Sequence, residues 1–272
     1  GIRFFIFTSY YKVPTSKDMK VFCIDIGNTH THCATVDESF KAENSADFDS
    51  AGFAEVFDDM KLFEKSGAQA ISWCSVVPRY SKEFQDRVSG IKEVFNLNFK
   101  TSPMRIDMHY PEQVGQDRIA DALGAGVFFK PPYIVVDMGT AVTIDFVDKD
   151  GNYAGGSISP GMHAFAEYLS ERAAQLPKID PSKADYSLII GKDTVEAMYV
   201  GCAKGFCKLA DGIIGDIENE YFGGESASAK TVFTGGNIRF LPLSWIGERK
   251  IELNLAQIGL ARAYFFNKLK GL

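Results

Sequence analysis

One short pattern occurs twice in this chain, and it restricts the possible folds more than any other feature. Val21–Thr29 reads VFCIDIGNT and Ile134–Thr140 reads IVVDMGT, so each is an apolar strand ending in Asp-x-Gly, with Thr close behind. Each copy is followed by a second strand-like stretch that closes in Val-Asp, at Asp37 and at Asp148. The first Asp pair is 112 residues apart (25 to 137) and the second is 111 apart (37 to 148). This nearly constant spacing predicts a duplicated chain with two similar halves.

The rest of the chain fits an α/β fold. Strand-like segments such as 70–77 alternate with helical patterns such as 255–269, as expected for an α/β protein. Pro131-Pro132 marks the predicted boundary, which gives a first half over residues 19–130 and a second half over 131–272. Residues 1–18 precede the first strand and are interpreted as an N-terminal extension or tag that the fold does not require, or as a native arm on a neighbouring subunit.

Composition excludes several classes of protein. Apolar residues make up 46% and charged residues 24% of the chain, which is typical of a globular protein. The 29 Lys and Arg against 35 Asp and Glu give a net charge of −6, so a dedicated nucleic-acid binder is not expected. No apolar run approaches the roughly 18 residues that a membrane helix needs. Five scattered cysteines favour reduced, buried thiols in a cytoplasmic protein over a disulfide framework or a zinc site.

The duplicated pattern also points to a chemistry. A carboxylate at the end of a buried strand can hold a hard cation, and the glycine turn after it lets backbone N–H groups approach phosphate oxygens. Two such turns in two halves can face one nucleotide across a cleft. The chain contains neither a P-loop motif nor a dinucleotide-binding glycine motif in its usual context, so phosphate would be bound by a different scaffold.

The ordered set of motifs resembles the type III pantothenate kinases, which belong to the acetate kinase, sugar kinase and actin superfamily. This resemblance covers nearly everything from Met19 onward and implies two ribonuclease-H-like halves with the active site in the cleft between them. The matching motifs are Asp25-Ile26-Gly27-Asn28-Thr29, Ser75-Val76-Val77-Pro78, Gly115-Gln116-Asp117-Arg118, Asp137-Met138-Gly139-Thr140, Gly155-Gly156-Ser157-Ile158-Ser159-Pro160-Gly161, Leu176-Pro177, Ile190-Gly191-Lys192-Asp193-Thr194, Thr234-Gly235-Gly236, Asn254-Leu255 and Gly259-Leu260.

The resemblance implies transfer of the γ-phosphoryl group of ATP to pantothenate, the first step toward coenzyme A, by a homodimer. It assigns Asp117 as the proton acceptor and Asp137 as the ligand of a monovalent cation, K⁺ or NH₄⁺. Magnesium would accompany ATP, held by Asp25 directly or through water. By position, the ATP-binding residues are Asp25, Ile26, Gly27, Asn28, Thr29, His30, Thr31, His32 and Thr140, and the pantothenate-binding residues are Gly115, Gln116, Asp117, Arg118 and Thr194.

One position departs from the family pattern. The family usually has a substrate-contacting Tyr seven residues before the glycine of the G-x-D-R motif, where this chain has Met108. Tyr110 lies only five residues before Gly115.

The residues themselves allow simpler interpretations. Asp117 precedes a helical pattern, so it could be a carboxylate stabilised at a helix N-terminus or only an N-cap. Arg118 suits a ligand that carries a carboxylate. His30 and His32 share one face of a strand, yet no third metal ligand is evident. Alternative functions are a kinase or phosphatase of another small molecule, or a non-catalytic accessory factor in gene regulation.

Overall fold

The computed structural model describes residues 19–224 and 226–271, so the predicted extension over residues 1–18 lies outside the described residues. By packing, the described chain forms two compact units. Unit 1 contains the chain up to Pro131, Val147–Ala154 and the segment from Asn254 onward, and unit 2 contains Pro132–Phe146 and Gly155–Leu253. The described helices include none that is long and apolar enough to cross a membrane.

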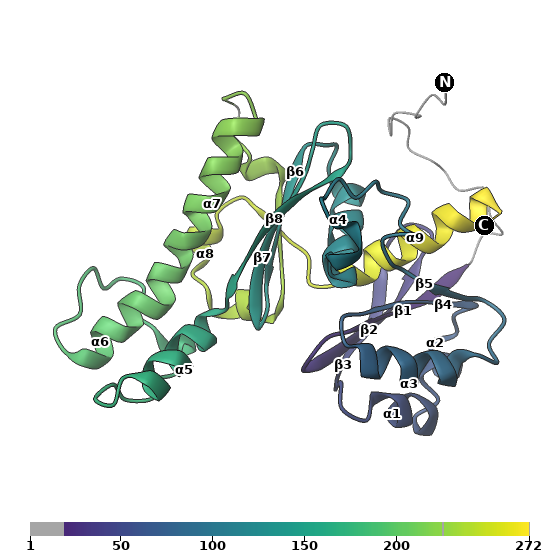
Figure 1. Ribbon diagram of the computed structural model, residues 1–272, viewed down its shortest axis with the longest axis horizontal. Helices are drawn as coiled ribbons and strands as arrows, with labels where there is room; N and C mark the ends of the chain where they lie inside the picture. Colours follow the sequence, from purple (N-terminus) through teal and green to yellow (C-terminus); the bar gives the residue numbers. More distant parts are fainter. Residues whose placement is uncertain (1–18, 225, 272) are drawn as a thin grey trace. The chain divides into compact units, whose positions relative to one another are not determined.

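Unit 1 is built on a five-stranded sheet with the strand order β3-β2-β1-β4-β5 (Figure 1). Its strands are β1 (Lys20–Ile26), β2 (His30–Asp37), β3 (Ala42–Asp49), β4 (Ala70–Ser75) and β5 (Val94–Asn96). Its helices are α1 (Phe53–Asp59), α2 (Leu62–Ser66), α3 (Pro78–Val88), the short η1 (Pro111–Gln113), α4 (Gln116–Phe128) and α9 (Leu255–Lys270).

Unit 2 is built on a second five-stranded sheet, with the order β10-β9-β6-β7-β8. The strands are β6 (Tyr133–Met138), β7 (Ala141–Val147), β8 (Tyr153–Pro160), β9 (Thr231–Thr234) and β10 (Lys250–Ile251). The helices are α5 (Met162–Arg172), η2 (Pro181–Lys183), α6 (Thr194–Tyr199), η3 (Val200–Lys204), α7 (Gly205–Tyr221), η4 (Ser228–Lys230), η5 (Gly236–Phe240) and α8 (Leu243–Ile246). Its core joins β6, β7 and β9 to apolar side chains of α5, α7 and α8.

The two sheets repeat the same arrangement, which confirms the α/β fold with two similar halves. Reading the second sheet from β8 to β10 gives the order β8-β7-β6-β9-β10, so each strand matches the strand at the same place in the first sheet. β1 pairs parallel with β4, and β6 pairs parallel with β9. The two strands that end in Asp-x-Gly, β1 and β6, therefore occupy the central position of their sheets.

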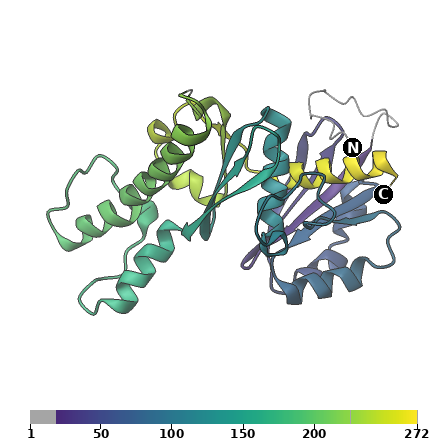
Figure 2. The same cartoon turned by 45° about the horizontal axis from the view of Figure 1, so that its top comes forward.

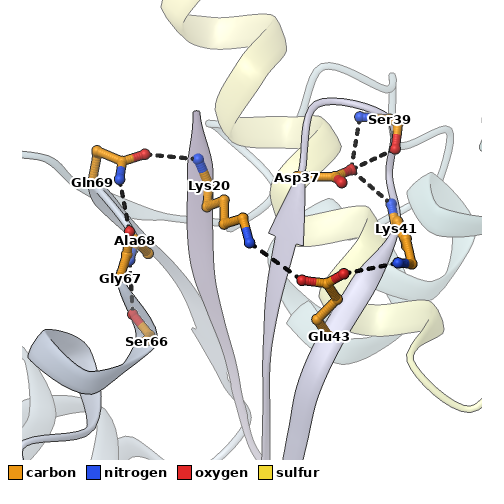
Figure 3. Close-up of polar contacts among 9 residues, drawn as sticks. All are labelled: Lys20, Asp37, Ser39, Lys41, Glu43, Ser66, Gly67, Ala68 and Gln69. Atoms are coloured by element: carbon orange, nitrogen blue, oxygen red, sulfur yellow. Dashed lines mark hydrogen bonds and ion pairs between the residues drawn. The ribbon is translucent and has the colours of Figure 1, made fainter. Parts of the chain in front are cut away.

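The duplication includes the turn that follows the second strand of each pattern, because an Asp side chain stabilises this turn in the same way in both halves. Oδ1 of Asp37 accepts hydrogen bonds from the N–H groups of Ser39 and Lys41 at 2.8 and 3.0 Å (Figure 3). Oδ1 of Asp148 likewise accepts from the N–H groups of Asp150 and Asn152, at 2.9 Å each. The Val-Asp pairs of the sequence are therefore turn-forming residues, because a short carboxylate here satisfies backbone donors that the turn leaves free.

The structure also shows why the spacing of the first Asp pair exceeds that of the second by one residue. β1 ends at Ile26 and β2 begins at His30, whereas β6 ends at Met138 and β7 begins at Ala141. The glycine turn is thus Gly27–Thr29 in the first copy and the shorter Gly139–Thr140 in the second.

Unit 1 has a core on each face of its sheet. Alternate residues of β1 point to opposite faces because a strand has a period of two. Phe22, Ile24 and Ile26 pack with apolar side chains of α1 and α3. α9 covers the other face (Figures 1 and 2), where Ser72 Oγ of β4 donates a 2.8 Å hydrogen bond to the Leu260 carbonyl.

The crossing of α4 and α9 depends on two glycines. A Cβ added to Gly259 would lie 1.8 Å from the Ala120 carbonyl oxygen, and one added to Gly124 would lie 2.2 Å from that of Leu255. Both helices can therefore approach closely only without side chains at these positions. This packing places the C-terminal helix in unit 1, which differs from the sequence-based division that assigned it to the second half.

We expect Gly259→Ala to destabilise the protein by about 1–3 kcal/mol, because the methyl group must push the backbones of α4 and α9 apart. The matched control is Gly212→Ala in α7, where nothing lies within 4 Å of the added Cβ. That change should stabilise the helix by up to about 1 kcal/mol. Urea unfolding measures whether the free energy of unfolding falls in Gly259→Ala and rises in Gly212→Ala. Equal stability of Gly259→Ala and wild type would contradict the close packing of α4 against α9.

All five cysteines are buried and free, which confirms the prediction of unpaired thiols.

Candidate functional site

The first glycine turn follows Asp25, near the end of the central strand of unit 1. A Cβ on Gly27 would lie 2.8 Å from the His30 carbonyl oxygen, so this tight turn requires glycine. Asn28, Thr29 and His30 are exposed and available to a ligand. Thr31 is buried instead, with its hydroxyl 3.0 Å from that of Ser50. Among residues 25–32, which were predicted to bind ATP, the exposed residues 28–30 are accessible to a phosphate group. Ile26 and Thr31 are core residues.

The Asp25 carboxyl group is half-buried, and its loss of water contact raises its pKa. A 3.3 Å hydrogen bond from the Cys74 thiol and the nearby His32 ring act in the opposite direction. The pKa of Cys74 is raised well above its ordinary value, first by burial and then by the negative charges of Asp25, Asp117 and Asp121. The fold thus brings Asp25 and Asp117, predicted from separate motifs, into one acidic neighbourhood around a protonated thiol.

Helix α4 begins at the G-x-D-R motif, and its first turn carries Asp117 and Arg118. Gly115 occupies the N-cap position and no side chain caps the helix, so the interpretation of Asp117 as an N-cap is wrong. Oδ1 of Asp117 instead accepts from the N–H of Arg118 at 2.7 Å. A carboxylate in the first turn of a helix is stabilised in its charged form by the helix dipole. Gln116 uses its Oε1 within the protein, accepting from the Ser75 N–H at 3.0 Å.

A pocket of about 570 Å³ opens beside this helix start, within unit 1. Its volume falls in the range typical of small-molecule sites. The Arg118 guanidinium lies 5.8 Å from the centre of the Tyr153 ring, in a cation–π arrangement that orients it. Met108 and Tyr110 both line the pocket. The position at which this chain has Met108 instead of the family's Tyr is therefore part of the pocket lining. The lining residues are Asp107, Met108, His109, Tyr110, Gln113, Val114, Arg118 and Ala154.

The second glycine turn lies in unit 2 and is enclosed by other backbone segments. Gly235 has φ 92°, and a Cβ there would lie 2.3 Å from Oδ1 of Asp137, so two reasons require glycine. Asn237 Nδ2 donates a 2.8 Å hydrogen bond to the Gly139 carbonyl. Thr140 is exposed, and its carbonyl accepts from the Gly161 N–H at 3.0 Å. This packing holds the half-buried Asp137 beside the Gly235 turn. Two glycine motifs that were recognised separately in the sequence therefore lie next to each other in unit 2.

Thr194 is the first residue of α6 in unit 2 and is exposed. Asp193 caps this helix, since its side chain accepts from the Glu196 N–H at 2.8 Å. Glu196 in turn accepts from the Lys192 N–H at 2.7 Å, which completes a reciprocal cap. Thr194 is thereby held at a well-defined helix start.

His30 and His32 do not form a metal site within the described part of the chain, where no group of three or more His, Cys, Asp or Glu side chains could hold an ion. Both rings are exposed, with centres 6.3 Å apart. His32 Nδ1 contacts Asp47 Oδ1 on the neighbouring strand β3.

Sequence reasoning missed Cys74 and Tyr153 as parts of this site. Cys74 becomes relevant because the parallel register of β1 and β4 places it opposite Asp25. Tyr153 reaches Arg118 because the start of β8 joins unit 1, through a parallel bridge to Ile106. Neither long-range pairing has a local signal, although Cys74 directly precedes the S-V-V-P motif.

Comparison with known proteins identifies the family. The family model for type III pantothenate kinase matches residues 21–216. A type III pantothenate kinase of Hyphomonas neptunium is 37% identical over 212 residues, covering 73% of this chain and 82% of the relative. One from Dehalococcoides mccartyi strain BAV1 is 32% identical over 278 residues, covering 92% and 97%.

Solved structures show the same fold at lower sequence identity. A Campylobacter jejuni protein assigned to the Baf family of transcriptional activators matches 92% of this chain and all of that chain, with a TM-score of 0.59 and 21% identity. The activator of 2-hydroxyisocaproyl-CoA dehydratase from Clostridium difficile, solved with bound ADPNP, matches 93% and 97% with a TM-score of 0.54 and 13% identity. These likenesses concern the fold, whereas the family model and the curated relatives establish that the chain belongs to the type III pantothenate kinase family.

Proposed function

We propose that this protein transfers the γ-phosphoryl group of ATP to the primary alcohol of pantothenate, the first step of coenzyme A synthesis. The observation that carries the proposal is the start of α4 in unit 1. There Arg118 lines a pocket large enough for a small molecule, while the adjacent Asp117 lies in the acidic neighbourhood of Asp25.

The acceptor binds through its carboxylate. Arg118 provides a planar pair of N–H donors that matches a carboxylate, and the Tyr153 ring limits the orientations of the guanidinium. Binding the charged end of pantothenate at Arg118 directs its hydroxyl end along the pocket. Thr194 is proposed as a further substrate contact from unit 2.

The glycine turns bind the nucleotide. Backbone N–H groups and the Thr29 hydroxyl in unit 1, and Thr140 in unit 2, are proposed to contact the ATP phosphates. Phosphoryl transfer depends mainly on such positioning and on charge neutralisation.

Asp117 acts as the general base. As the pantothenate hydroxyl oxygen attacks the γ-phosphorus, the proton passes to the Asp117 carboxylate, and the bond to the β,γ-bridging oxygen breaks to release ADP. The 2.7 Å hydrogen bond from the Arg118 N–H to Oδ1 fixes the Asp117 carboxylate at the start of α4.

A kinase of this kind uses a divalent metal with ATP, and the residues present fit magnesium. Mg²⁺ is usually held by one or two carboxylates together with phosphate oxygens and water, which agrees with a single half-buried carboxylate at Asp25 beside the phosphate turn. When bound, the ion would neutralise negative charge on the phosphates. Asp137 is proposed to hold a monovalent cation.

We further propose a homodimer located in the cytoplasm. Apolar side chains exposed on unit 2, such as Ile158, Ile189 and Ile190, suit a subunit contact. Five unpaired cysteines suit a reducing compartment. A non-catalytic regulatory role is not favoured, because the acidic residues Asp25, Asp117 and Asp137 are all present.

The test is an assay of ADP release with magnesium and ATP, in which pantothenate is compared with a panel of sugars and small carboxylates. Pantothenate should be the preferred acceptor, with the phosphate located on its primary alcohol by mass spectrometry and NMR. Preferred turnover of a sugar would assign the site to another small-molecule kinase, and no turnover of any acceptor would favour the accessory role.

A further inference from the structure

The end of strand β4 contacts two parts of the candidate site of unit 1. Cys74 Sγ donates to Asp25 Oδ1 at 3.3 Å, across the register that pairs these two residues. The next residue, Ser75, donates its backbone N–H to Gln116 Oε1 at 3.0 Å. β4 therefore links the strand before the phosphate turn to the helix that carries Asp117.

The thiol is the only side-chain hydrogen-bond donor to Asp25 within residues 19–224 and 226–271. The side chain of an Asp can rotate about two bonds, so a half-buried carboxylate with a single donor depends on that donor for its orientation. Cys74 itself is fully buried between strands and helices and has little freedom to move. A neutral donor also leaves the charge of Asp25 available for a cation, whereas a Lys or Arg would neutralise it.

We propose that Cys74 is a positioning residue, whose thiol holds the Asp25 carboxylate in the orientation that binds the magnesium–ATP complex. This inference rests on the proposed nucleotide-binding role of the first glycine turn. Cys74 does not touch the substrate, and it acts only through Asp25.

The experiment compares Cys74→Ala, which removes the donor, with Cys74→Ser, which retains one. The matched control is Cys23→Ala on β1, because Cys23 is equally buried and its thiol donates to the Val21 carbonyl at 3.7 Å rather than to Asp25. Calorimetry measures ADP binding with magnesium and with EDTA, and steady-state kinetics give kcat and the KM for each substrate.

For Cys74→Ala we expect about 10- to 100-fold weaker binding of magnesium–ADP, the usual effect of losing a hydrogen bond to a charged group. Binding in EDTA and the KM for pantothenate should change little. Cys74→Ser should stay within about threefold of wild type, because the hydroxyl restores a hydrogen bond of similar kind.

Two results would overturn the role of Cys74: equal effects of Cys74→Ala and Cys23→Ala on magnesium-dependent binding, or a loss in Cys74→Ser as large as in Cys74→Ala. If the alanine variant does not fold, Cys74→Ser alone still tests the proposal, because a loss of about tenfold or more in its affinity for magnesium–ADP would overturn it. Failure of the proposed function looks different, because wild type would then bind magnesium–ADP but not phosphorylate pantothenate.

Discussion

Asp117→Asn is expected to lower kcat by about 10²–10⁴-fold, the range typical of losing a general base. The amide cannot accept the proton of the pantothenate hydroxyl, yet it has nearly the same volume and its oxygen can still accept from the Arg118 N–H. Folding, ATP binding and the KM for pantothenate should therefore change little. Initial rates together with nucleotide titration measure these quantities separately.

The control for this variant is Asp86→Asn, an isosteric change at an exposed position on α3 of the same unit. It should leave kcat, KM and the melting temperature unchanged. Retention of more than about a tenth of the wild-type kcat in Asp117→Asn would show that Asp117 only supports the start of α4.

Removal of potassium and ammonium is expected to lower turnover by about 10²-fold or more, comparable with loss of a preorganised charge-stabilising group. In the proposed mechanism the nucleotide phosphates add several negative charges to those of the site carboxylates, and like charges repel strongly where water is scarce. The monovalent cation proposed at Asp137 would offset part of this charge without the rigid octahedral shell that magnesium requires. Asp137→Asn should either destroy activity or weaken the dependence on the cation.

Initial rates are measured at fixed magnesium while potassium is replaced by sodium or a bulky organic cation at constant ionic strength. Asp216→Asn, at an exposed position on α7 of the same unit, is the matched control and should keep the wild-type dependence. Equal rates in all three salts would rule out the monovalent site and leave Asp137 as a ligand or orienting group for magnesium.

Features encoded locally could be predicted from the sequence alone. The Asp-x-Gly pattern, its repetition and the alternation of strands with helices are properties of short segments, and they predicted two similar α/β halves, each with a glycine turn after an apolar strand that ends in Asp. The repeated Val-Asp pairs at Asp37 and Asp148 were also visible in the sequence, and the structure shows that their carboxylates accept from backbone N–H groups two and four residues away. The ordered motifs were sufficient to indicate the family.

Only the tertiary structure decided how distant segments meet. The register of β1 and β4 places the Cys74 thiol on Asp25, and the start of β8 brings Tyr153 to Arg118. Likewise, the contact of Gly124 and Gly259 assigns α9 to unit 1 although it ends the chain. Such placements depend on strand register and helix packing between residues far apart in sequence, and no local propensity specifies them.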